Sequence, residues 1–213
     1  MSSTASRLPL SQDELRFIEE LERAGALVNM DPQRVPDGGS ATVISCFDGD
    51  RFPDLYGFHR DFCGAHKGMN CITPVCIPGG PAVLSEHSPL RTSTVIKDLP
   101  IDWGAVALSK TLLGFQIKGA GIIKSTGHYP CAACRAHSLS PETMAELFVT
   151  GTDVLLAQLP KHLPQGAPSP KIVTCVHIDY FSHRKSGGRK LMATYKLLRQ
   201  PLADVLGRRD QAA

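Results

Sequence analysis

The central segment of the sequence is Gly127-His128-Tyr129-Pro130-Cys131-Ala132-Ala133-Cys134, which follows an apolar run from Ala120 to Ile123. This order predicts a strand that ends in an elbow and passes into a helix. His128 and Cys131 offer an imidazole nitrogen and a thiolate three residues apart, and zinc is the commonest cation that accepts this mixture. The chemistry of the segment therefore depends on whether another part of the chain supplies the remaining ligands.

A further candidate ligand stands at the end of a second predicted strand. The run from Ala41 to Cys46 is short, apolar and β-branched, which is typical of a central strand covered on both faces, and the polar segment 47–51 follows it. Loops after the C-terminal ends of parallel strands form the ligand crevice of an open sheet. Of the remaining cysteines we favour Cys46, so that Cys46, His128 and Cys131 bind one Zn²⁺ ion and leave one tetrahedral position open, as in catalytic zinc sites.

The hydrophobic pattern predicts an α/β fold with a mostly parallel central sheet flanked by helices. Helices are expected from Ser11 to Ala24, Pro53 to Phe58, Asp102 to Leu113 and Pro141 to Leu159. Strands are expected at Ala41 to Cys46, Cys71 to Ile77, Ala120 to Thr126, Lys171 to Tyr180 and Arg189 to Leu197, the last two forming a hairpin at the sheet edge. This divides the chain into an N-terminal helical arm (1–40), a single zinc-binding domain (41–200) and a tail (201–213).

Composition and charge narrow the class of protein. The 213 residues suit one domain, and a formal charge of +3, from 23 basic and 20 acidic residues, gives no strong electrostatic footprint for nucleic acid. No run approaches the roughly 18 apolar residues of a membrane helix, and the N-terminus lacks an apolar signal core. We expect a cytoplasmic protein whose seven cysteines are core residues or metal ligands, with no membrane or nucleic-acid partner.

These segments resemble the β-class carbonic anhydrases. Cys46-Phe47-Asp48 followed by Arg51 is similar to the family's Cys-x-Asp-x-Arg segment, and Gly127 to Ala133 is similar to its Gly-His-x-x-Cys-Gly-Gly segment. Ile77-Pro78-Gly79-Gly80 resembles the family's glycine-containing strand end. The resemblance covers roughly Ala41 to Leu159.

The resemblance implies reversible hydration of carbon dioxide to bicarbonate by metal-bound hydroxide. It implies that Cys46, His128 and Cys131 bind Zn²⁺, and that Asp48 paired with Arg51 orients the nucleophile. It also implies a homodimer or higher even homo-oligomer, because the family's active site lies near a subunit interface. The helix of the N-terminal arm is expected to pack against the main body or to embrace the second subunit.

One departure from the family pattern concerns the ion pair. The family's arginine stands two residues after the motif aspartate, where this chain has Asp50, and Arg51 comes one residue later. If Arg51 reaches Asp48, the pair keeps the carboxylate off the metal; if it does not, Asp48 is a competent fourth ligand that closes the site. Two other functions therefore stay open: hydrolysis of carbonyl sulfide or carbon disulfide, and a non-catalytic zinc-stabilised binding protein.

Other cysteine patterns have simpler interpretations. Cys131-x-x-Cys134 matches a redox motif or half of a zinc ribbon, but the chain has no second Cys-x-x-Cys. Cys63-x-x-His66 matches a metal half-site, but we favour a loop thiol and a surface imidazole as the interpretation. Cys71, Cys76 and Cys175 fall in predicted strands, where cysteine acts as a small hydrophobic residue.

Overall fold

The computed structural model describes residues 8–30, 40–48, 51–63, 71–93, 100–180 and 192–210. Several features predicted from the sequence lie outside these residues. They are the inserted Asp50, the imidazole of His66 and most of the turn between the two strands of the C-terminal hairpin.

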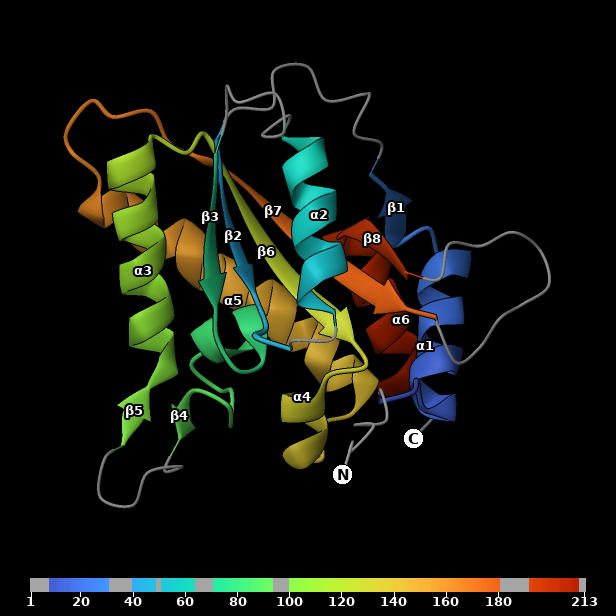
Figure 1. Cartoon of the computed structure of the whole chain (residues 1–213). Helices are drawn as coiled ribbons and strands as arrows, with labels where there is room; N and C mark the ends of the chain where they lie inside the picture. Colours follow the sequence, from blue (N-terminus) through green and yellow to red (C-terminus); the bar gives the residue numbers. More distant parts are fainter. Residues whose placement is uncertain are drawn as a thin grey trace, which may run out of the picture.

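A six-stranded sheet forms the centre of the molecule (Figure 1). Its order is β1 (Leu27–Asn29), β8 (Met192–Leu197), β7 (Lys171–Asp179), β6 (Ile122–Tyr129), β2 (Ala41–Ser45) and β3 (Ile72–Cys76). The pairs β7–β6, β6–β2 and β2–β3 are parallel, whereas β1–β8 and β8–β7 are antiparallel. The prediction of a mostly parallel sheet is therefore wrong, and the sheet is mixed.

The antiparallel part of the sheet explains this error. β7 and β8 pair as the predicted antiparallel hairpin, but β8 is not the edge strand. β1 pairs outside it, with Leu27 opposite Leu197. β1 has three residues and begins shortly after the first helix ends, so it is too short to produce a period-two pattern in the sequence.

Helices cover both faces of the sheet. Their bounds are α1 Gln12–Arg23, α2 Phe52–Phe62, α3 Trp103–Lys118, α4 Ala132–Ala136, α5 Pro141–His162 and α6 Arg199–Asp210, with a 3₁₀ helix, η3, at Gly80–Leu84. A separate two-stranded sheet pairs β4 (Thr92–Ser93) with β5 (Ile101–Asp102). α2 lies across one face of the central sheet, and α3 and α5 lie on the other (Figure 1).

Helix ends follow the predicted signals in most cases. Ser11 and Glu14 form the expected capping box of α1, and the Ser140 side chain accepts a hydrogen bond from the Thr143 N–H at the start of α5. Asp102 caps α3 as predicted, but the helix continues through Gly114 and ends at Gly119, whose φ is +58°. A Cβ at Gly114 would lie 2.9 Å from the Thr73 side chain. Glycine at this position therefore lets α3 pack closely against β3 and does not end the helix.

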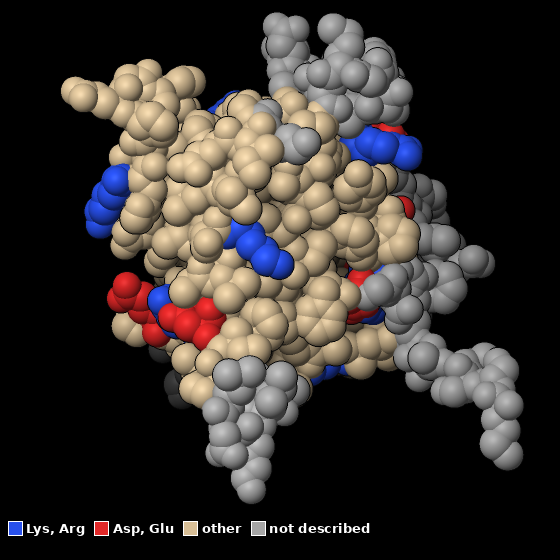
Figure 2. All heavy atoms as spheres, turned by 60° about the vertical axis from the view of Figure 1, so that its left-hand side comes forward, with Lys and Arg blue, Asp and Glu red and all other residues tan. Residues whose placement is uncertain are grey.

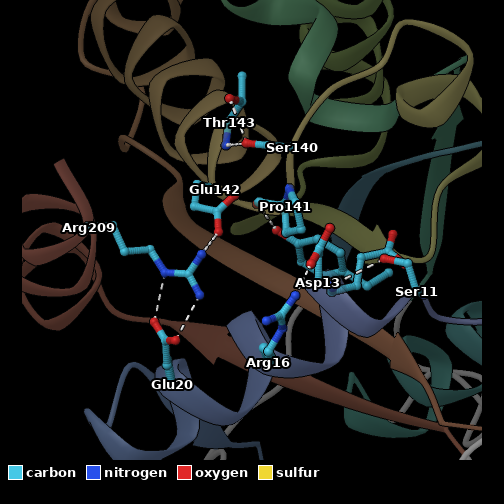
Figure 3. Close-up of polar contacts among 11 residues, drawn as sticks. Ser11, Asp13, Arg16, Glu20, Ser140, Pro141, Glu142, Thr143 and Arg209 are labelled. Atoms are coloured by element: carbon cyan, nitrogen blue, oxygen red, sulfur yellow. Dashed lines mark hydrogen bonds and ion pairs between the residues drawn. The ribbon is translucent and has the colours of Figure 1, made fainter. Parts of the chain in front are cut away.

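The described helices of the predicted arm and tail, α1 and α6, pack against the main body. Phe17 and Leu21 of α1 are fully buried in the same core cluster as Leu202 and Val205 of α6. A three-residue ion-pair network, drawn in Figure 3, joins the helices: the Arg209 guanidinium of α6 contacts both Glu20 of α1, at 2.8 Å, and Glu142 of α5. α1 therefore packs against the main body, one of the two arrangements expected for it, and residues 199–210 form a packed helix.

The surface on the α3 side carries few charges. Figure 2 shows this side, where uncharged side chains predominate and basic and acidic groups are scattered. Leu113 and Ile117 of α3 are 54% and 64% exposed. Among the described residues, no helix combines the length and the apolar character that a bilayer crossing requires.

Two glycines in helices test the packing of α5 on η3. A Cβ at Gly151 of α5 would overlap the carbonyl oxygen of Pro81, whereas a Cβ at Gly207 of α6 would meet no atom within 4 Å. We expect Gly151→Ala to lower the free energy of unfolding by about 2 kcal/mol through overpacking. Gly207→Ala should raise it by about 0.5–1 kcal/mol through helix propensity. Urea denaturation of both variants measures the difference, and equal stabilities would contradict this packing.

Candidate metal centre

Three side chains from distant parts of the sequence meet at the C-terminal ends of the parallel strands. Cys46 directly follows β2, His128 is the penultimate residue of β6, and Cys131 is the N-cap of α4. One ligand atom from each lies within 4.8 Å of the other two. The structure thus brings together the trio that the sequence analysis favoured.

The chemistry of this trio fits a metal ion. All three side chains are buried, and neither ring nitrogen of His128 has a hydrogen-bond partner among the described residues. Buried polar atoms are nearly always paired in folded proteins, so an imidazole with both nitrogens unpaired needs another partner. Two sulfur donors and one imidazole nitrogen are what borderline and soft divalent cations prefer. The trio can therefore hold a metal ion.

Both thiols hold their protons tightly when the metal is absent. A hydrogen bond with Cys131, followed by burial, raises the pKa of Cys46 to about 12. A hydrogen bond with Cys134, followed by burial, raises the pKa of Cys131 to about 12. His128 lies near enough to Cys46 to offset part of this rise, although its ring does not make a well-formed hydrogen bond. A bound cation would have to displace both thiol protons.

Local packing explains why the chain turns at this point. Tyr129 follows His128 and, by strand alternation, points to the opposite face of β6. There its hydroxyl donates to the Pro141 carbonyl at 2.6 Å, and its ring meets those of Phe17 and Phe148 edge-on. Gly80 of η3 approaches the backbone at Cys46 so closely that a Cβ would lie 3.0 Å from the Cys46 nitrogen. These contacts hold His128 towards Cys46.

The ion pair predicted beside the trio is present. Nη1 of Arg51 lies 2.7 Å from Oδ2 of Asp48, and Arg51 is the N-cap residue of α2. The extra residue between them therefore does not prevent the contact. The Asp48 carboxylate is not part of the ligand group. Of the two arrangements left open by the sequence, the structure has the one in which Asp48 pairs with Arg51.

Two further partners of Arg51 were not predicted from the sequence. Nη2 donates to the Leu8 carbonyl at 2.6 Å, and Nε lies 3.3 Å from Oδ2 of Asp179. The Nε contact is an ion pair without good hydrogen-bond geometry. Asp179 is the last residue of β7, which pairs in parallel with β6. Because the ends of parallel strands meet at one edge of the sheet, this position could have identified Asp179 from the sequence. A backbone carbonyl such as that of Leu8 leaves no signal in the sequence.

The other described cysteines do not form a second centre. Cys134 is a fully buried free cysteine that forms a hydrogen bond with the Cys131 thiol, but it lies outside the ligand group. Cys63 accepts a hydrogen bond from Lys124 at 3.4 Å, and its proposed partner His66 lies outside the described residues. Among the residues that the structure describes, Cys46, His128 and Cys131 are the only trio of His, Cys, Asp or Glu close enough to bind one ion.

A pocket of about 700 Å³ lies between α1, α5 and α6, and its charged side chains are already paired with one another. Three arginines line it, and each is paired with a carboxylate. Arg16 pairs with Asp13, and Arg209 pairs with Glu20 and Glu142 (Figure 3). Arg135 pairs with Glu14. The arginines of this pocket are therefore all engaged by carboxylates, and the pairs made by Arg135 and Arg209 join different helices. The trio is therefore the better candidate for function.

Comparisons with protein-family models, with curated proteins and with solved structures found no match. The geometry of the trio and of the Arg51 contacts therefore carries the functional argument.

Removing one sulfur should abolish the centre. Cys46→Ser is expected to weaken zinc binding at least about a hundredfold, because loss of a direct ligand costs more than loss of an outer hydrogen bond. Cys71→Ser is the control, since Cys71 contacts Ser40 and lies outside the trio. Metal analysis after dialysis against a competing chelator measures bound zinc. Full retention of zinc by Cys46→Ser would refute this ligand assignment.

Zinc affinity should depend steeply on pH. At pH 7 both thiols of the metal-free protein are protonated, because each pKa is raised to about 12. Zinc binding then releases two thiol protons, so the association constant should fall about a hundredfold for each unit by which pH is lowered between pH 8 and 7. Competition with a chromophoric chelator gives the constant at each pH. A pH-independent constant would show that the thiols are not the ligands.

Proposed function

We propose that the chain is a zinc-dependent enzyme that catalyses the reversible hydration of carbon dioxide to bicarbonate, in the manner of the β-class carbonic anhydrases that it resembles. One observation carries the proposal: the buried trio Cys46, His128 and Cys131 lies in the same strand-end region as the ion pair of Asp48 and Arg51. A three-ligand site with a neighbouring carboxylate that stays off the metal is the arrangement of catalytic, rather than structural, zinc.

Zinc bound by the trio would supply the Lewis acidity that makes water nucleophilic near neutral pH. The residues of the chain supply position. The Asp48 carboxylate accepts a hydrogen bond from Arg51 at Oδ2, and an ionised carboxylate can accept several hydrogen bonds, one of which the proposal assigns to the nucleophile. Arg51 holds that carboxylate in place and, because it is buried, does so with little competition from water. Asp48 and Arg51 are thus the proposed catalytic pair.

The enclosed setting favours a small, uncharged substrate. The three ligands are at most 7% exposed, whereas the Asp48 side chain is 16% exposed. Carbon dioxide is small and linear, and so are carbonyl sulfide and carbon disulfide. Assays of these substrates on one zinc-loaded preparation separate the proposal from a related hydrolase.

An oligomer is part of the same proposal. Phe47, between Cys46 and Asp48, is 59% exposed. An exposed aromatic ring beside the centre is a natural contact for a second subunit, as the proposed homodimer or higher even homo-oligomer requires. The proposal places the activity in the cytoplasm, on the sequence argument alone.

Loss of the Asp48 charge should reduce turnover. We expect Asp48→Asn to lower kcat for carbon dioxide hydration about a hundredfold, because a positioned proton acceptor contributes about that much. Asp61→Asn is the control, since Asp61 is a half-exposed α2 residue paired with Arg60, and its kcat should equal that of the parent. Stopped-flow assays of zinc-loaded proteins measure both. If the parent binds stoichiometric zinc but hydrates carbon dioxide no faster than the uncatalysed reaction, the enzyme proposal is rejected. The chain would then be a non-catalytic zinc protein.

A further inference from the structure

We infer that Asp179 is a positioning residue that holds Arg51, and through it Asp48, so that the fourth position of the metal centre stays open. This inference rests on the proposed function, because it concerns the same centre. Asp179 ends β7 and is not one of the predicted ligands. The contact on which the inference rests is the one between Asp179 and Arg51.

Three different segments bind the Arg51 guanidinium. Nη1 binds Asp48 at 2.7 Å, Nη2 binds the Leu8 carbonyl at 2.6 Å, and Nε lies 3.3 Å from Asp179. Arg51 and Asp179 are each only 2% exposed, so water does not screen their contact appreciably. A guanidinium is a rigid planar fork, so contacts on its separate edges fix its orientation as well as its position.

The extra residue before Arg51 makes such support necessary. Arg51 is the N-cap of α2 and lies three positions after Asp48. A long arginine side chain at this place can adopt many rotamers, and one contact with Asp48 would leave the guanidinium free to swing about that contact. Asp179 comes from the strand next to β6, which carries His128, and so ties Arg51 to the edge of the sheet that forms the centre.

Loss of Asp179 should change the coordination of the metal. Asp48 stands two residues after Cys46 in the chain, so its carboxylate is tethered close to one of the ligands. If Arg51 no longer holds it, that carboxylate can turn to the metal, and carboxylates are competent zinc and cobalt ligands. Asp179 therefore determines whether the fourth position is available to an outside ligand.

The test uses Co²⁺ as the metal and azide as the outside ligand, read by visible absorption. The parent is expected to bind azide with a change in its cobalt spectrum. Asp179→Asn should bind cobalt stoichiometrically but azide at least about tenfold more weakly, because Asp48 competes for the position. Asp48→Asn combined with Asp179→Asn should restore azide binding. Asp153→Asn, which removes a half-exposed pair with Arg199, should match the parent.

A second variant guards against simple loss of folding. Asp179→Asn leaves the buried Arg51 charge with fewer partners, so Arg51→Gln combined with Asp179→Asn removes both charges and keeps a polar side chain at each position. This double variant should also bind azide weakly. Parent-like azide binding in either folded variant would overturn the inference. Loss of folding in both variants would also overturn it, because the contact between Arg51 and Asp179 would then be needed for folding itself.

The outcome is separable from that of the proposed function. A cobalt- or zinc-loaded parent that binds azide but does not hydrate carbon dioxide would reject the reaction while the comparison of variants still tests Asp179. A parent that hydrates carbon dioxide, with an Asp179→Asn variant that binds azide equally well, would reject only the role of Asp179.

Discussion

The parallel pairing of β2 with β6 is the constraint on which the metal centre depends. The two strands pair in register from Ala41 opposite Ile122 to Ile44 opposite Ser125. This register places Cys46, at the end of β2, beside His128, although the two residues are 82 positions apart in the chain. Parallel strands end at the same edge of a sheet, so the donors meet there without any local sequence contact. A shift of one residue would turn His128 to the opposite face.

A row of buried polar side chains supports α2 over that face. Lys124 and Thr126 precede His128 at alternate positions of β6 and therefore share its face. The Lys124 Nζ donates to Cys63 at 3.4 Å and lies 3.6 Å from the centre of the Phe62 ring, and burial lowers its pKa. His59 of α2 lies 3.2 Å from the Thr126 hydroxyl, and burial, followed by the charge of Lys124, holds its pKa well below the ordinary value.

These contacts link the position of α2 to the metal centre. Arg51 begins α2, so any shift of the helix relative to β6 moves the guanidinium relative to Asp48 and Asp179. The unpaired nitrogens of His128 make the centre incomplete as a purely protein structure. Metal binding would satisfy them, and for that reason metal binding and folding should be thermodynamically coupled.

The sequence alone determined the local features that depend on neighbouring residues. The capping box at Ser11, the start of α5 at Ser140 and the strands that lead to Cys46 and His128 were predicted, because periodicity and capping act within a few residues. The ligand trio was predicted by a different route, from the convergence of parallel strand ends and the resemblance to a known family. The tertiary structure decided the rest: the antiparallel side of the sheet, the packing of α1 and α6 into the core, and the contact of Arg51 with Asp179. Each of these joins segments far apart in the chain, and only the folded arrangement of the sheet brings such segments within interaction distance.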